Sequence, residues 1–263
     1  MNQAVLYNID DTTGIGTITM NRPDVLNAID VATANGLADA MLAMKNSDNL
    51  KVILLEANGR AFVAGGDLAG FKNDYDNAKV FLDQLLDPLD IFVNLMHDIS
   101  VPVVGSVAGA AAGAGLSIVA ACDVVISTQS AKYVLAYNQV AAVPDCGGSW
   151  NLTRKIGAKN LAAMMYLGES WSAEQALQNG LITKIVADDE LKSETDKLVA
   201  KMAQGPSVAF AQFKALAKSA LNNDLQSQLD AERAAFKQCI DSNDFKIGVD
   251  AFLNRQKPQF TGK

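Results

Sequence analysis

Hydrophobic and polar residues alternate in two short stretches near the start of the chain, at 5–9 and 15–20. The link between them, Asp-Asp-Thr-Thr-Gly, is rich in turn residues, so this period-two pattern predicts a β-hairpin. Residues 30–44 instead carry hydrophobic side chains at helical spacing, and residues 51–56 form an apolar run typical of a buried strand. The pattern therefore begins as strand, strand, helix, strand.

Strands and helices keep alternating through the middle of the chain, which indicates an α/β layered core. A long helix is predicted over 78–99, with a kink at Pro88. A capping-box pattern at Ser172–Gln175, followed by Gly180, predicts a short helix. Strands are predicted at 103–107, 123–127, 132–135 and 181–186, and a buried helix at 116–121.

The pattern changes after Asp188, where strand signals stop and four amphipathic segments follow. We expect a core over 1–195 and a helical region over 196–263 that must pack on the core or on neighbouring subunits. Phe210, Phe213, Phe236 and Phe252 supply aromatic area for that packing. The helices are predicted at 190–203, 207–221, 225–242 and 244–255.

Two segments rich in glycine and alanine, 61–68 and 108–115, lie between these elements. Without large side chains, their backbone can approach a ligand closely. The second segment also opens the helix at 116–121, where unpaired N–H groups and the positive end of the helix dipole point outward. Such N–H groups would stabilise a carbonyl oxygen that gains negative charge during a reaction.

Three simpler explanations compete for the second segment. The uncharged stretch from Ile99 to Cys122 is long enough for a membrane span, but its glycine and alanine content, Pro102 and the flanking aspartates argue against one. A dinucleotide-binding loop would need a third glycine where Ile118 stands. Close packing of a small-residue helix against a sheet needs no chemistry at all, and this explanation stays open.

Composition narrows the class of protein. The chain has 263 residues, of which 49% are hydrophobic and 19% charged, so it is globular, with one large domain or one domain plus a small appendage. Its formal net charge of −7 argues against nucleic acid as the main partner. Cys122, Cys146 and Cys239 show neither metal spacing nor a disulfide framework, and the first residues show no signal-peptide pattern. We therefore expect a reduced, cytoplasmic setting.

Candidate catalytic side chains are few. His97 is the one histidine and ends a predicted helix, which favours a structural role over membership of a catalytic triad. Asp67 and Asp145 each precede a predicted helix, so each either caps that helix or is free for chemistry.

Four motifs follow one another along the chain: Asn21-Arg22-Pro23 with Leu26-Asn27-Ala28, residues 61–68, residues 108–115 followed by Cys122-Asp123, and Pro144-Asp145-Cys146-Gly147-Gly148 followed by Arg154. In this order they resemble the motifs of the crotonase, or enoyl-CoA hydratase/isomerase, superfamily, and the resemblance covers essentially the whole chain. The fourth motif and the terminal Pro258–Lys263 are similar in style to isomerases that act on ring-1,2-epoxyphenylacetyl-CoA in phenylacetate breakdown.

This resemblance implies an α/β fold of the crotonase (ClpP-like) type, a superhelical spiral of ββα turns with a C-terminal helical trimerisation region. It implies an acyl-CoA thioester substrate, no cofactor beyond the coenzyme A of that substrate, no metal, and a homotrimer or a hexamer made of two trimers. By motif position, the N–H groups of Gly66 and Ala114 form an oxyanion hole. Substrate-binding residues are implied at Val25, Leu26, Ala28, Ala64, Gly65, Asp67, Leu68, Gly113, Tyr137, Val140 and Pro144.

The departures from the family pattern concern the catalytic acids. Hydratases of this family use two glutamates, whose positions correspond to Ser117 and Tyr137. Neither a serine nor a tyrosine is a good base near neutral pH. Asp145 remains as the one well-placed acid, and we expect an apolar pocket lined by Tyr137, Val140 and Val143 to favour its role in proton transfer.

We therefore expect an acyl-CoA isomerase that shifts a double bond, or opens a ring epoxide, through proton transfer by Asp145 and an enolate held by the two amides. The alternatives are an enoyl-CoA hydratase with an altered base and a catalytically silent acyl-CoA-binding trimer. Neither nucleic acid nor a membrane is expected as a partner.

Overall fold

Six strands form the main sheet of the protein, whose computed structural model describes residues 3–263. The first two strands pair antiparallel, as the hairpin pattern predicts, and every other pair of neighbours is parallel. Parallel neighbours need crossover connections, which the helices between them supply. In sheet order, the strands are β1 (Val5–Asp10), β2 (Ile15–Met20), β3 (Val52–Ala57), β4 (Val103–Val107), β6 (Val124–Thr128) and β9 (Lys184–Val186).

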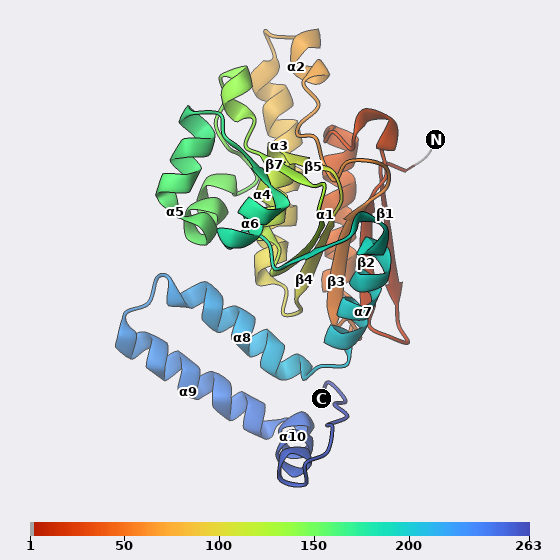
Figure 1. Cartoon of the computed structure of the whole chain (residues 1–263), viewed down its shortest axis with the longest axis vertical. Coiled ribbons are helices and arrows are strands. Elements are labelled where there is room, and N and C mark those ends of the chain that lie inside the picture. Colours follow the sequence, from red (N-terminus) through yellow and green to blue (C-terminus); the bar gives the residue numbers. More distant parts are fainter. Residues whose placement is uncertain (1–2) are drawn as a thin grey trace.

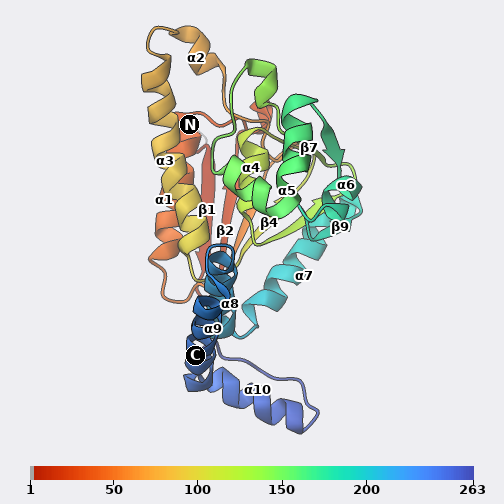
Figure 2. The same ribbon diagram turned by 90° about the vertical axis from the view of Figure 1, so that its left-hand side faces the viewer.

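Helices cover both faces of this sheet, because alternate side chains of each strand point to opposite faces. On β3, Ile53 and Leu55 belong to the large core, whereas Val52 and Leu54 belong to a smaller cluster completed by α7. Figure 2 shows α1 and α3 on one side of the strands and α7 on the other. The core helices are α1 (Val31–Lys45), α3 (Ala78–Asp98), α4 (Ala114–Ala121), α5 (Gly148–Tyr166) and α7 (Leu191–Ala203).

A second, three-stranded sheet contains two strands that the sequence pattern does not predict, β5 (Ala110–Ala112) and β8 (Ser170–Ser172). Neither strand contains a β-branched residue, a composition signal that favours strands. Between them lies β7 (Lys132–Val134). The predicted capping box is confirmed, since Ser172 caps α6 (Ala173–Gln178) and Gln175 returns a hydrogen bond. The short elements that complete the core are α2 (Ala69–Asn73), η1 (Pro23–Val25), η2 (Tyr137–Val140) and η3 (Asp188–Glu190).

The long predicted helix is present, and α3 runs through Pro88, which is buried; the kink expected there stays a prediction. The last strand, β9, begins at Lys184, three residues later than predicted. The membrane-span alternative is not supported, since no helix within residues 3–263 is long and apolar enough to cross a bilayer. The uncharged stretch contributes the strands β4 and β5 and one helix, the eight-residue α4.

The C-terminal helices form an arm that extends below the core in Figure 1. The predicted boundary at residue 195 falls inside α7, whose Val199 and Ala203 are buried against the sheet, so the arm begins only at Ser207. The helix α7 belongs to the core because its apolar face covers Val52 and Leu54 of the sheet. The arm consists of α8 (Ser207–Ala220), α9 (Leu225–Asp241) and α10 (Asn243–Leu253), close to the predicted ranges.

Polar contacts fix the start of the arm to the core. The ammonium of Lys214 donates hydrogen bonds to the backbone oxygens of Met96 (2.7 Å) and Val101 (3.1 Å) and pairs with Asp123 (2.7 Å). Lys218, one turn later on α8, pairs with Asp98 (2.5 Å). The Lys214 side chain is only 11% exposed, so its three partners compensate for the loss of water around its charge.

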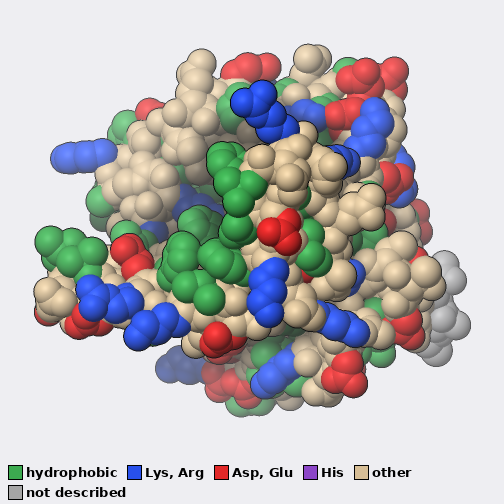
Figure 3. All heavy atoms as spheres, turned by 90° about the horizontal axis from the view of Figure 1, so that it is seen from below, with side chains coloured by type: hydrophobic (Ala, Val, Ile, Leu, Met, Phe, Trp, Pro, Cys, Tyr) green, Lys and Arg blue, Asp and Glu red, His purple; other side chains and the backbone are tan. Residues whose placement is uncertain are grey.

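Most of the arm's apolar surface remains uncovered in the single chain. No residue of α8 is buried, and on α9 Ala235 alone is. Phe213, Phe236 and Phe252 are 70%, 59% and 83% exposed. Figure 3, a view from the arm's end of the molecule, shows hydrophobic side chains gathered beside Lys and Arg. The arm therefore presents apolar surface that nothing in this chain buries.

Candidate active site

Two neighbouring parallel strands, β3 and β4, direct both glycine- and alanine-rich segments to the same edge of the sheet. Beyond the strands, these segments form one more parallel bridge, between Val63 and Ala111, in which Ala112 donates its N–H to the oxygen of Val63 (2.8 Å). This bridge keeps the two segments side by side as they lead to Gly66 and Ala114, each three residues beyond it. The carboxyl edge of parallel strands is where open α/β sheets bind ligands.

A second bridge sets the direction of the Gly66 N–H. Ile29 donates its N–H to the oxygen of Gly65 (2.8 Å) and accepts a hydrogen bond from Asp67 (2.8 Å). The oxygen of Gly65 and the N–H of Asp67, on either side of Gly66, therefore both point to Ile29. Since successive peptide groups of an extended chain point to opposite sides, the Gly66 N–H points away from Ile29. Within residues 3–263 this N–H has no acceptor.

Ala114 is the first residue of α4, and the first N–H groups of a helix have no partner inside it. The described part of the chain offers the Ala114 N–H no acceptor either. Gly113 precedes it with a φ of 53°, a conformation that favours glycine. A β-carbon on Gly113 would lie 3.5 Å from the Cα of Gly65, so the two segments are in contact. Two free N–H groups on adjacent segments suit one oxygen that develops negative charge.

Asp145 lies at the hydroxyl end of the Tyr137 ring, the same end that approaches Gly113. The hydroxyl of Tyr137 donates a hydrogen bond to Oδ1 of Asp145 (2.5 Å), and the ring carbon Cζ is 4.0 Å from the position of a β-carbon on Gly113. The half-buried Asp145 does not cap the next helix, because α5 begins at Gly148 with Gly147 as its N-cap. Asp145 therefore does not cap this helix, and its role in proton transfer stays a prediction.

Asp67, the other candidate, is engaged in holding the structure together. It does not occupy the N-cap position of α2, which is Leu68, although its carboxylate accepts a hydrogen bond from the N–H of Ala69 (3.1 Å). The same carboxylate lies 3.6 Å from the guanidinium of Arg22, which also pairs with Asp30 (3.1 Å). Any contact between Asp67 and a substrate would therefore come from its backbone.

The two positions where the family's hydratases have glutamates form a closed polar pair. The Ser117 hydroxyl is 3.4 Å from the Tyr137 hydroxyl and 3.4 Å from the oxygen of Gly113, and both side chains are buried. A β-carbon on Gly148 would lie only 2.2 Å from the Ser117 hydroxyl, so α5 fills the space beside it. Burial, and then the negative charge of Asp145, raise the pKa of Tyr137, which makes it a hydrogen-bond donor and not a base.

Two further titratable groups respond to the charge on Asp145. Burial raises the pKa of Asp90 on α3, and the charges of Asp87 and Asp145 raise it further. Burial raises the pKa of the Cys146 thiol, and Asp145 adds to that effect. Both shifts follow from placing negative charges near one another in a partly dehydrated region.

The expected apolar enclosure of Asp145 is incomplete in the single chain. Val140 is 48% exposed and Val143 is 74% exposed, so the prediction that these two side chains wall off Asp145 is wrong for this chain alone. Burial of a side chain on a surface turn depends on what packs against it, which a local pattern does not contain. Tyr137, at 7% exposed, is the one predicted wall residue that is buried.

The loop predicted to contact coenzyme A lies beside the first amide segment. Leu26 and Asn27 adopt left-handed φ angles of 55° and 56°, and Ala64 donates its N–H to the oxygen of Leu26 (3.1 Å). Arg22 donates to the oxygen of Ala28 (2.5 Å), which fixes the far end of the loop. Val25 is 45% exposed and available for contact.

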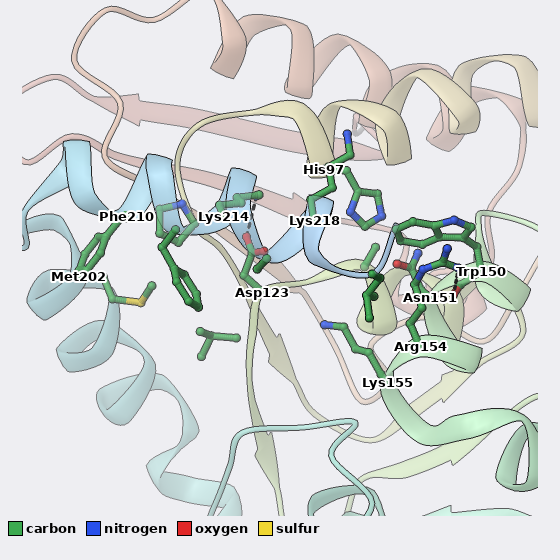
Figure 4. A pocket seen from close by; sticks show the side chains of 16 residues that line it. His97, Asp123, Trp150, Asn151, Arg154, Lys155, Met202, Phe210, Lys214 and Lys218 are labelled. Carbon is green, nitrogen blue, oxygen red and sulfur yellow. Dashed lines mark hydrogen bonds and ion pairs between the residues drawn. The ribbon is translucent and has the colours of Figure 1, made fainter. Parts of the chain in front are cut away.

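A cavity of about 470 Å³ lies elsewhere, between the core and α8. Figure 4 shows it lined by His97, Trp150, Arg154 and Lys214, among others, and none of the predicted site residues lines it. His97 sits in the last turn of α3 with its ring against Trp150 at 5.2 Å, and burial lowers its pKa. Within the described residues, no group of three His, Cys, Asp or Glu side chains could hold a metal ion.

Comparisons with known proteins agree with this geometry. Residues 10–263 match the profile of the enoyl-CoA hydratase/isomerase family. The chain is 35% identical over 259 residues to a "Probable enoyl-CoA hydratase" of Rhodobacter capsulatus, covering 98% of each chain. It is also 35% identical over 267 residues to the 1,2-epoxyphenylacetyl-CoA isomerase of Escherichia coli, covering 100% of each.

The fold is likewise similar to a crystal structure from Mycobacterium abscessus that is named for the same hydratase/isomerase class. The TM-score is 0.93 at 30% identity, covering 99% of this chain and 100% of the other. The likeness extends over the arm as well as the core, since only 1% of this chain lies outside it.

Asn27 ties the loop beside the site to the core, and its removal should cost stability. Its side chain is 1% exposed, accepts a hydrogen bond from the N–H of Arg22 (2.8 Å) and donates to the oxygens of Asn58 and Ala61 (2.9 Å each). Asn27→Ala should lower the free energy of unfolding by about 2–4 kcal/mol in urea denaturation, because buried partners lose their hydrogen bonds.

The matched control is Asn35→Ala, which removes an exposed asparagine whose amide bonds only within its own helix (2.7 Å). Its unfolding free energy should stay within about 0.5 kcal/mol of the original protein. Equal losses in the two variants would contradict the role given to Asn27.

Proposed function

Because the chain belongs to the enoyl-CoA hydratase/isomerase, or crotonase, family, we propose that it is an acyl-CoA isomerase with Asp145 as its single base. One observation carries the proposal. Tyr137 and Ser117, which replace the hydratase glutamates, are hydrogen-bonded to each other, and Asp145 is the carboxylate next to them. A single carboxylate suffices for moving a proton between two carbons of the same molecule.

The reaction begins with removal of a proton from the carbon next to the thioester. Asp145 accepts that proton, and the C–H electron pair moves into the thioester carbonyl to form an enolate. The enolate oxygen carries the negative charge, and the N–H groups of Gly66 and Ala114 hold it. Because Ala114 is the first residue of α4, the positive end of that helix dipole also lies at this site.

The second step returns the proton. Asp145, now neutral, donates it to a carbon further along the acyl chain, and the electron pair of the enolate system forms the new C–H bond. The thioester carbonyl is restored, the double bond has moved, and no atom has been gained or lost. The name of the Escherichia coli relative favours a ring-epoxide acyl group, whose isomerisation must in addition break a bond of the three-membered ring, whereas these two steps alone convert an aliphatic 3-enoyl group.

Hydration is the second candidate function, because the Rhodobacter capsulatus relative is named for it. A hydratase must hold and activate a water molecule, and the space beside Ser117 is filled by Gly148. Asp145 alone would then have to activate water. Parallel assays of crotonyl-CoA hydration and 3-hexenoyl-CoA isomerisation separate the two functions, and a silent acyl-CoA-binding protein would bind both thioesters and convert neither.

Removing the proposed base should abolish isomerisation. Asp145→Asn keeps the size of the side chain and its ability to accept a hydrogen bond from Tyr137, but an amide cannot accept a proton near neutral pH. We expect kcat for 3-hexenoyl-CoA to fall by roughly 10²–10⁴-fold, the usual contribution of general base catalysis. Calorimetric binding of the thioester should change little.

The matched control for this variant is Asp90→Asn, which removes a neighbouring carboxylate on α3 that feels the charge of Asp145. It should keep turnover within about threefold, because removing the charge of Asp90 only reduces its repulsion with the like charge of Asp145. Loss of turnover in Asp90→Asn together with its retention in Asp145→Asn would transfer the role of base to Asp90.

The oxyanion amide of Ala114 can be deleted with little damage, because proline is well accepted at the first position of a helix. Ala114→Pro removes the N–H and should lower kcat by roughly 10²–10³-fold, the typical loss for one oxyanion-hole donor. The control is Asn243→Pro, at the exposed first position of α10, which should leave kcat unchanged. Equal kinetics in the two variants would contradict the oxyanion role of Ala114.

We also propose that copies of this chain assemble through the arm into a homotrimer or a pair of trimers. The arm carries Phe213, Phe236 and Phe252 at 59–83% exposure and has no core of its own, so burial against another copy would remove this area from water. The arm also lies at the opposite end of the molecule from α2 in Figure 1, so it leaves its own chain's amide segments uncovered.

Charges on this surface should therefore break the assembly. Phe213→Glu combined with Phe252→Glu should shift the protein towards a monomer in light scattering, because burying two carboxylates in an apolar contact is unfavourable. Tyr7→Glu places the same charge on β1, where Tyr7 is 51% exposed, and should not change the mass. An unchanged oligomer in the double variant, or a monomer for the original protein, would refute assembly through the arm.

A further inference from the structure

We propose that Tyr137 is a positioning residue for Asp145, holding its Oδ1 so that Oδ2 is the oxygen that exchanges protons with the substrate. The inference rests on the proposed function, because it assigns how the base of that reaction is oriented. It is independent of the acyl group, and it concerns a residue that occupies a position where the family's hydratases carry a base.

The backbone around Tyr137 is fixed on both sides. Tyr137 is the first residue of η2, and the flanking residues Ala136 and Ala141 both have left-handed φ angles, of 62° and 54°. The N–H of Tyr137 donates to the oxygen of Leu135 (2.8 Å), and its own oxygen accepts from Ala142 (3.0 Å). Such a turn has few alternative conformations, so the Cα–Cβ bond of Tyr137 has one direction.

The side chain is fixed as well. Its ring is 7% exposed and lies against Gly113, with Cζ 4.0 Å from the position that a β-carbon there would occupy. A hydroxyl at the end of a clamped ring has a set position, and it donates to Oδ1 of Asp145 at 2.5 Å. Ser117, 3.4 Å from the Tyr137 oxygen, can donate to that oxygen and so leaves the tyrosine proton directed at Asp145.

The chemical consequence follows from which groups surround the carboxylate. Tyr137 faces it from η2, Asp90 from α3, and the Cys146 thiol lies next to it in the chain. Burial keeps the tyrosine and the thiol in their neutral forms. Tyr137 therefore stabilises the ionised carboxylate with a hydrogen bond, whereas the charge of Asp90 acts in the opposite sense.

The same hydrogen bond decides where the captured proton resides. Oδ1 already accepts the tyrosine proton, so a proton taken from the substrate must sit on Oδ2. It then stays on the oxygen that faces the substrate and can be delivered to a second carbon without rotation of the carboxyl group. Tyr137 thus acts through Asp145, without touching the reacting atoms.

The direct test is Tyr137→Phe, which removes the hydroxyl and keeps the ring. We expect kcat for 3-hexenoyl-CoA to fall by roughly 10- to 100-fold with KM nearly unchanged, because ground-state binding does not use the hydroxyl.

The matched control is Tyr133→Phe. Tyr133 is also fully buried and its hydroxyl also donates to a side chain, the Ser127 hydroxyl at 2.7 Å, but on β7 and β6, away from Asp145. Tyr133→Phe should lose comparable stability without changing kcat. An effect confined to unfolding in both variants would reduce Tyr137 to a structural residue and overturn the proposal.

A second substitution covers the case in which Tyr137→Phe does not fold. Replacing Tyr137 by 3-fluorotyrosine keeps the ring and the hydroxyl donor, so kcat for 3-hexenoyl-CoA should stay within about threefold of the original. A loss of 10-fold or more would show that kcat does not follow this hydrogen bond and would overturn the positioning role. Retained turnover in Asp145→Asn would instead overturn the proposed function, so the two failures are distinguishable.

Discussion

The parallel bridge between Val63 and Ala111 is the constraint on which the site depends. It extends the pairing of β3 and β4 beyond the end of the main sheet and so sets the register of the two small-residue segments. The two segments stay in contact as far as Gly65 and Gly113, the residues before Gly66 and Ala114, with Ile29 directing one amide and the start of α4 directing the other. Because the backbone supplies both donors, the site needs segments without bulky side chains, and this explains their glycine and alanine content.

In the proposed reaction, Asp145 contributes the complementary half of the chemistry. The amides stabilise negative charge wherever an acyl thioester places it, but they cannot move a proton. A carboxylate such as Asp145 can move a proton. Among the residues that the structure describes, no second carboxylate is hydrogen-bonded to Asp145, Tyr137 or Ser117. Strong enolate stabilisation combined with one base suits the movement of a proton within a substrate better than the addition of water, which in this family uses two acids.

Local sequence patterns predicted much of the fold because the physics behind them is local. The hairpin of β1 and β2, the capping box at Ser172 and the arm helices each depend on residues close in sequence. The partnership of Tyr137 with Asp145 has no such signature, since it depends on the positive φ of Ala136 and on a ring packed against Gly113. The exposure of Val143 likewise depends on what does or does not pack over a surface turn. Gly66 and Ala114 were assigned through family motifs, and only the contact of Gly65 with Gly113 in three dimensions shows that the two segments meet.

Exchange of hydrogen for deuterium next to the thioester tests the central claim most directly, because it reports enolate formation without requiring the natural acyl group. Phenylacetyl-CoA incubated with the protein in D₂O should gain deuterium at the carbon beside the carbonyl, as followed by NMR. Exchange should be lost when Asp145 carries an amide and should slow strongly when the Ala114 N–H is absent. Exchange at the original rate in both variants, or none with the intact protein, would contradict an enolate held by these amides and formed by this aspartate.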